Sequence, residues 1–202
     1  MDWRRMKSNH VLRSNTGGSA SLLTRGRPCL ALFVQIALLA AGFALRAADA
    51  TSEFAKPVID IGMVVKDAGR TAQFLTNAIG FKEVRGFEVA GELGRKIGLL
   101  DGQSTSARVF LLQEGNTATR IKVLCFPQAP GKTADQSFIH TTLGFRYLTL
   151  YVKDMSRAVE RLQAAKVPLL GETPVDLGGG NMLVACKDPD GNFIELIGPK
   201  KK

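Results

Sequence analysis

Four polar side chains stand in apolar, strand-like runs of the sequence, and their types could support ligand binding or proton transfer. Lys122 lies in "RIKVLCF" and Glu195 in "NFIELIG", each between two aliphatic neighbours, while Asp60 opens "DIGMVV" and Tyr147 opens "YLTLYV". A buried charge costs free energy unless it is paired. Because successive side chains of a strand point to opposite faces, each of the four can lie on the face of its strand away from its apolar neighbours. Ordinary outward-facing strand residues are the alternative.

Two of these runs belong to an internal repeat. "DIGMVVKD" (60–67) and "YLTLYVKD" (147–154) both end in Val-Lys-Asp, and both precede a stretch with helical spacing of apolar residues. Asp67 and Asp154 are placed to accept hydrogen bonds from the first free amides of the two helices. The repeat therefore predicts two copies of one module, each beginning with a strand that leads into a helix.

Three strand-like runs follow each predicted helix. In the first half they lie at 82–90, 108–113 and 120–126, with a short helix expected within 92–100, and in the second half at 169–177, 182–187 and 192–198. A segment rich in Pro and Gly links the halves at 127–145. Each half is thus a strand, a helix and three strands, and two such units can pack helices on one face and share the other.

The first 50 residues have the pattern of a secretory signal peptide. They carry seven of the 27 Lys and Arg, then the uncharged run from Leu30 to Leu45, then Ala-x-Ala ending at Ala50. A membrane-spanning helix needs about 20 apolar residues, more than this run supplies. We expect residues 1–50 to be a signal peptide with a long basic n-region, so that the protein contacts the membrane only during export to a bacterial periplasm or the extracellular space. An uncleaved anchor is the alternative.

Net charge gives no evidence for a nucleic-acid partner. Removing seven basic and two acidic residues from the total of 27 and 18 leaves 20 and 16, a net of +4, and three of these charges are the terminal lysines 200–202. No basic stripe is interleaved with aromatic residues, as nucleic-acid binding would favour. Cys125 and Cys186 both lie in strand-like segments, where they could form a disulfide or remain free.

The repeated module resembles the vicinal oxygen chelate superfamily, which includes glyoxalase I, fosfomycin- and bleomycin-resistance proteins and extradiol dioxygenases. "ACKDPDGNFIELIG" (185–198) is similar to the closing hairpin of that family's second module, and "GFRYLTLYVKDMSRAVERLQ" (144–163) to its opening strand and helix. The resemblance covers about residues 57 to 198. It implies an α+β fold in which two βαβββ modules form a curved mixed sheet, with helices on the convex face and the site on the concave face.

This resemblance divides the mature chain, residues 51–202, into parts. Module one spans 57–126, the linker 127–145 and module two 146–198, and a lysine tail follows at 199–202. Relatives often form homodimers by exchanging modules, so a homodimer is possible here as well.

The resemblance also implies where a metal would bind. Metal-dependent relatives take ligands from the first and last strands of the modules, and the corresponding positions here hold Asp60, Lys122, Tyr147 and Glu195. Zinc and related transition metals favour imidazole together with carboxylate, whereas a lysine ammonium cannot ligate them. We therefore expect no metal cofactor, with Lys122 between the two carboxylates and Tyr147 donating a hydrogen bond. If a divalent metal is bound, Asp60 and Glu195 are the candidate ligands.

Two main functions follow as expectations from this resemblance. The first is an exported protein that binds a small molecule through Asp60, Lys122, Tyr147 and Glu195. The alternative is an enzyme, a glyoxalase-like lyase, an isomerase or a dioxygenase, with an atypical metal site or with Lys122 and Tyr147 as catalytic residues. A module that uses its sheet for assembly is a third possibility.

Other chemically capable residues have simpler explanations. "GGGN" (178–181) precedes a strand rather than a helix, which favours a loop over a phosphate cradle. Arg108 and Arg146 border predicted strands and could meet an anionic ligand, but surface arginines are common. His140 stands alone in the linker, which makes it a weak candidate for a general base.

Overall fold

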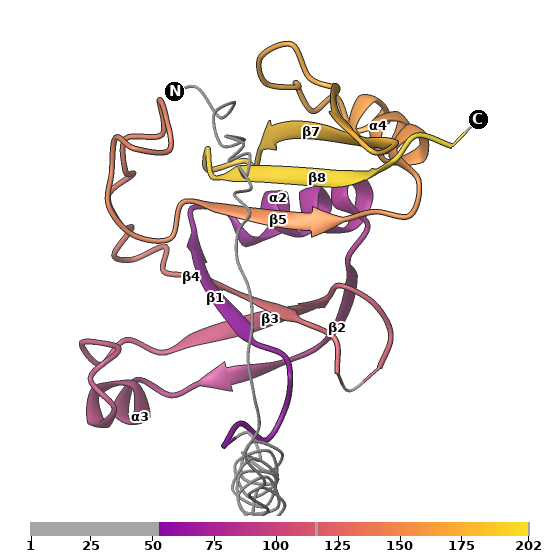
Figure 1. The fold of residues 1–202 in the computed structure, drawn as a ribbon. Coiled ribbons are helices and arrows are strands. Elements are labelled where there is room, and N and C mark those ends of the chain that lie inside the picture. The colour runs from indigo at the N-terminus through magenta and orange to yellow at the C-terminus, as the bar shows by residue number, and fades with distance from the viewer. Residues whose placement is uncertain (1–52, 116, 202) are drawn as a thin grey trace, which may run out of the picture. The chain divides into compact units, whose positions relative to one another are not determined.

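The computed structural model describes residues 53–115 and 117–201 (Figure 1). The chain divides into two units, and every element described below belongs to the second, Phe54–Lys202. The predicted signal peptide lies outside the described residues. Within the described ranges, no helix has both the length and the apolar character needed to cross a membrane.

Each half of the described chain forms one four-stranded mixed sheet. The first half contains β1 (Asp60–Val65), α2 (Ala68–Gln73), the π-helix η1 (Phe74–Ile79), β2 (Lys82–Val89), α3 (Gly91–Lys96), β3 (Thr105–Leu111) and β4 (Arg120–Cys125). The second half contains β5 (Tyr147–Tyr151), α4 (Met155–Ala164), β6 (Val175–Gly178), β7 (Asn181–Lys187) and β8 (Phe193–Pro199). The strand orders are β1-β4-β3-β2 and β5-β8-β7-β6, so the same topology occurs twice.

The first and last strands of each module run side by side. β1 is parallel to β4 and β5 is parallel to β8, while the remaining neighbours are antiparallel. The predicted α+β fold of two βαβββ modules is therefore confirmed. The predicted strand at 169–177 is mostly irregular: an isolated bridge joins Leu169 to Cys186, and regular pairing begins only at Val175, after Pro174. Proline has no amide hydrogen to donate to a strand partner.

Both helices begin as the repeat predicts. The Asp67 carboxylate accepts hydrogen bonds from the amides of Gly69 and Arg70 at 2.8 and 2.9 Å, and Asp154 accepts one from the Arg157 amide at 3.2 Å. In the first module α2 continues directly into η1, in which the hydrogen bonds span one residue more than in an α-helix. The Val-Lys-Asp sequence thus marks the change from strand to helix in both copies.

One apolar core joins the helices to one face of each sheet. η1 packs against α4, α2 against β4, and α4 against β8. The buried core includes Phe74, Leu75, Ala78, Phe110, Ile121, Val123, Met155, Ala158, Leu162, Val184, Ile194 and Leu196. The alternating strand residues point away from the helices, and we call this side of each sheet its open face. The candidate residues Asp60, Lys122, Tyr147 and Glu195 belong to the open faces.

Cys125 and Cys186 are free thiols, so the disulfide alternative is not formed. Both side chains lie on the core side of their sheets. Burial raises the pKa of the Cys186 thiol to about 11, with a smaller contribution from Asp188. The Cys125 thiol donates a weak hydrogen bond to the Lys66 carbonyl at 3.3 Å.

Candidate functional site

Asp60, Arg120 and Lys122 form a charged cluster on the open face of the first sheet, which we call the Asp60 cluster. Arg120 donates from Nε and Nη2 to the two Asp60 oxygens, at 2.8 and 2.5 Å. Lys122 Nζ lies 2.9 Å from Asp60 Oδ2. Asp60 and Arg120 are direct partners in the parallel pairing of β1 with β4, and Lys122 lies two residues further on the same face. Strand register alone therefore brings the three side chains together.

The cluster carries more positive than negative charge. Hydrogen bonds from Arg120 and then Lys122 lower the pKa of Asp60 to about 2, so its carboxylate is ionised near neutral pH. The side chain of Asp60 is 22% exposed, whereas those of Arg120 and Lys122 are 45% and 33% exposed. The two cations lie nearer to solvent than the anion that holds them, and the three side chains together carry a net charge of +1.

Glu195 and Tyr147 lie on the open face of the second sheet. The Glu195 carboxylate accepts a hydrogen bond from Thr149 Oγ1 at 2.8 Å, and the two residues are partners in the β5–β8 register. Tyr147 is half exposed and pairs with Phe193. Among residues 53–115 and 117–201, no hydrogen bond or ion pair joins Glu195 or Tyr147 to Asp60 or Lys122. Lys122 thus contacts one of the two expected carboxylates, because the other lies on a separate sheet with its own partner.

The side chains present do not fit a transition-metal centre. No group of three or more His, Cys, Asp or Glu residues is placed to hold an ion in the described part of the chain. Both oxygens of Asp60 already accept hydrogen bonds from cationic side chains. The two cations beside Asp60 would repel a metal ion and would compete with it for the carboxylate oxygens.

Arg120 and Thr149 also contact the candidate residues, and neither was among the site residues expected from the sequence. Each lies two positions from a candidate on the same strand, Arg120 before Lys122 and Thr149 after Tyr147. Because side chains two positions apart share a strand face, that spacing was a signal available in the sequence.

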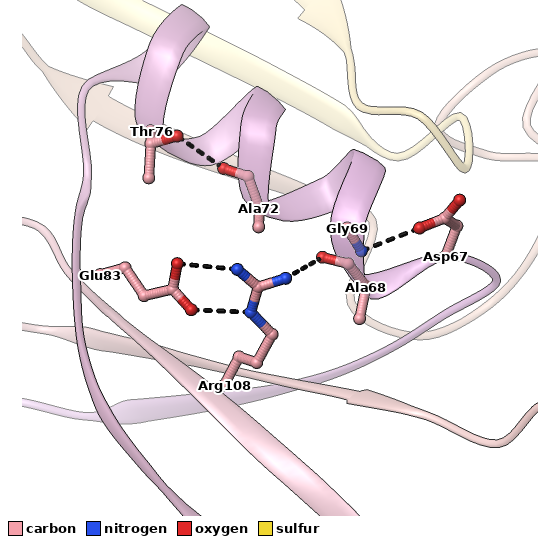
Figure 2. Close-up of polar contacts among 7 residues, drawn as sticks. All are labelled: Asp67, Ala68, Gly69, Ala72, Thr76, Glu83 and Arg108. Carbon is pink, nitrogen blue, oxygen red and sulfur yellow. Dashed lines mark hydrogen bonds and ion pairs between the residues drawn. The ribbon is translucent and has the colours of Figure 1, made fainter.

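Arg108 points toward the helix rather than the open face, as Figure 2 shows. Its Nε and Nη2 donate to the Glu83 carboxylate at 2.7 and 2.8 Å, and its Nη1 donates to the Ala68 carbonyl at 3.1 Å. The hydrogen bond from Arg108 is the main cause that lowers the pKa of Glu83. Arg108 therefore connects β2 and β3 to the start of α2.

Arg146 and His140 lie in and beside the linker. Arg146 donates to the carbonyls of Ile139 and Asp135, at 3.2 and 2.9 Å, and to Gln136 Oε1 at 2.7 Å. His140 is exposed and stacks on Phe138, with 5.7 Å between ring centroids. Through these contacts Arg146 stabilises the conformation of the linker.

The glycine-rich stretch at 178–180 is a turn. Its three glycines have φ values of 82°, 62° and 80°, and Gly178 pairs with Asn181 between β6 and β7. Left-handed backbone of this kind suits glycine, so the expectation of a loop is confirmed.

Comparison with known proteins agrees with this topology. The family model for the Glyoxalase/Bleomycin resistance protein/Dioxygenase superfamily matches residues 58–196. No curated protein matches the chain.

Solved structures resemble the fold at low sequence identity. A glyoxalase family protein from Bacillus cereus is 22% identical with a TM-score of 0.62, and the alignment covers 76% of this chain and all of that one. A glyoxalase I mutant from Zea mays is 18% identical with a TM-score of 0.52, covering 70% of this chain and 45% of its own. A glyoxylase/bleomycin resistance protein/dioxygenase domain from Frankia is 18% identical with a TM-score of 0.50, covering 74% and 93%. At these identities the likeness is one of fold.

Proposed function

Since the chain belongs to the Glyoxalase/Bleomycin resistance protein/Dioxygenase superfamily, we propose that it binds a small molecule on the open faces of its sheets without a resident transition metal. The Asp60 cluster carries this proposal. Arg120 and Lys122 both contact Asp60, the carboxylate among the candidate residues of the first sheet. Positive charge thus occupies the place where a metal would need to bind. Lys122, Tyr147 and Glu195 supply further polar groups to the ligand.

Elemental analysis of the purified chain tests the metal-free part of the proposal. We expect much less than one equivalent of zinc, nickel, iron or manganese per chain, and no change in thermal stability after treatment with a chelator. One tightly held equivalent would favour the alternative of a metal-dependent lyase, isomerase or dioxygenase. In that case, loss of the metal in Asp60→Ala and Glu195→Ala variants would identify its ligands.

A thermal-shift screen of small molecules tests ligand binding. A compound that binds only the folded state raises the melting temperature in a concentration-dependent way. We expect Lys122→Ala to reduce the shift caused by such a compound. Arg157→Ala is the matched control, because Arg157 is an exposed cation on α4, on the helix side of the second sheet rather than its open face. Equal shifts in both variants would remove Lys122 from the proposed site.

Export is the second part of the proposal, and the sequence of residues 1–50 supports it. We expect a mature chain that begins at Thr51 in the periplasmic or extracellular fraction. Mass spectrometry of that fraction checks the new N-terminus. A full-length chain held in the membrane fraction would favour the uncleaved-anchor alternative.

A homodimer is the third part, and exposed apolar side chains support it. The segment from the linker into β5 has three strongly exposed side chains, Leu143, Phe145 and Tyr151, and half-exposed Tyr147. A second copy that covers this segment would remove their apolar surface from water. Sedimentation should show a dimer that Phe145→Ser weakens, whereas a monomer across the micromolar range would contradict this part.

A further inference from the structure

The cations of the Asp60 cluster retain hydrogen-bond donors that Asp60 does not use. A guanidinium has five N–H donors and an ammonium has three. Arg120 uses Nε and Nη2 on Asp60, and Lys122 directs one Nζ donor to the same carboxylate. In the described ranges, Arg120 Nη1 has no acceptor and no second carboxylate approaches either cation. Both side chains are partly exposed, so these donors are accessible.

Open space lies beside these donors on the same face. Gly62 is the register partner of Lys122 and lies between Asp60 and Val64 along β1. Apart from Gly62 and its two chain neighbours, no described residue has an atom within 4 Å of the position that a Cβ of Gly62 would occupy. Exposed Val64 and half-buried Leu124 lie further along the same face. The cluster therefore has charged donors at one end and apolar side chains at the other.

We propose that Arg120 and Lys122 form the subsite for an anionic group, a carboxylate or a phosphate, on the small molecule that the protein binds. This inference rests on the proposed function and gives it a substrate class, because an arginine fork and an ammonium both favour oxyanions. The β1–β4 register places the two cations side by side, and Asp60 competes with the ligand for their donors. The apolar part of the ligand contacts Val64 and Leu124 above Gly62.

Asp60 distinguishes this role from a purely structural ion pair. If the cluster only joins β1 to β4, Asp60→Asn weakens the fold and has no effect on anions. If the cluster is an anion subsite, Asp60→Asn removes the competing charge and binding of an anion becomes tighter. For a partly exposed pair we expect about a two- to fivefold gain in affinity.

Benzoate and inorganic phosphate are the probes, and benzamide is the neutral counterpart of benzoate. Titration of the full chain, followed by the NMR signals of β1 and β4, should show saturable binding of at least one anion and none of benzamide. Saturation by benzoate alone indicates a carboxylate ligand with an apolar body, and saturation by phosphate alone indicates a phosphate ligand. Affinity should fall with added salt, because exposed charges are screened.

Variants then assign the binding to the cluster. Arg120→Gln and Lys122→Gln should each reduce the affinity for the anion about threefold or more, as loss of a screened ion pair implies. Gly62→Leu should block it while the melting temperature stays near that of the wild type, because the added side chain meets open space. Arg157→Gln is the control that should leave binding unchanged.

Failure of this inference is separable from failure of the proposed function. If a compound from the thermal-shift screen binds and none of the cluster variants alters its affinity, the anion subsite is wrong and small-molecule binding stands. If Asp60→Asn weakens anion binding, the subsite is also wrong. If neither anion nor any screened compound binds, both proposals fall.

Discussion

Asp60 on β1 and Arg120 on β4 are register partners that form a two-point ion pair, although 60 residues separate them in the chain. The pair holds the Asp60 carboxylate beside two cations, Arg120 and Lys122, on the open face of the first sheet. Several consequences for stability and reactivity can be measured directly.

The first prediction concerns how the stability of the fold depends on pH. The pKa of Asp60 falls from 3.8 to about 2 on folding, chiefly through Arg120 and then Lys122. A lowered pKa in the folded state adds stability that is fully present above pH 4 and is lost as the pH falls toward 2. Because Arg120 is nearly half exposed, we expect a contribution of at most about 1 kcal/mol. Urea unfolding between pH 2 and 6 should show a flatter profile in Asp60→Asn, and identical profiles would contradict the pairing.

A second prediction concerns Arg108, which connects two strands and the start of α2 (Figure 2). Arg108→Gln should lower the free energy of unfolding by about 1–2 kcal/mol, since Glu83 and the Ala68 carbonyl both lose a charged donor. Lys82→Gln is the matched control, because its pair with Glu114 is mostly exposed and solvent screens such a pair, so the change should leave stability nearly unaltered. Chemical denaturation measures both, and equal losses would show that Arg108 has no special role.

The two helix caps differ in strength. Asp67 accepts two amide hydrogen bonds and Asp154 accepts one. Asp67→Ala should therefore cost more stability than Asp154→Ala, within the usual range of about 0.5–2 kcal/mol for a lost cap. Asp67→Asn should recover most of the loss, because its side-chain oxygen can still accept from the same amides.

Thiol reactivity provides a further check. Burial raises the pKa of Cys186 to about 11, so its thiol stays protonated at pH 8, and its side chain has no exposed surface. Cys125 is only partly buried. Alkylation of the native chain at pH 8, located by peptide mapping, should modify Cys125 well before Cys186. Equal rates that become faster only after unfolding would show that both thiols are protected.

Local sequence rules predicted the elements of the modules better than their mutual placement. Asp67 and Asp154 were identifiable as caps because a strand, an Asp and a helical pattern adjoin in the sequence. The contact of Lys122 with Asp60 followed from the family resemblance, which places both residues at corresponding positions of one module. The separation of Glu195 from Lys122 could not be predicted, because strand alternation assigns a face within each sheet and gives no distance between side chains of different sheets.

Two further features depended on information that periodicity does not carry. The spacing from Lys122 assigns Arg120 to the same strand face, but its place opposite Asp60 follows from the parallel pairing of β1 with β4, and register across 60 residues is a tertiary property. The change of the first helix into the π-helix η1 was likewise not predictable, since the apolar spacing of 68–79 fits an ordinary helix equally well.

The β1-β4-β3-β2 strand order places the start and the end of the first module next to each other. The chain between β1 and β4 leaves this strand pair and returns to it, and α3 with its turns lies within that segment. Insertions or deletions around α3 can therefore change the length of the segment while Asp60, Arg120 and Lys122 keep their register. The length of the α3 region can thus change without moving the charges on the β1–β4 pair.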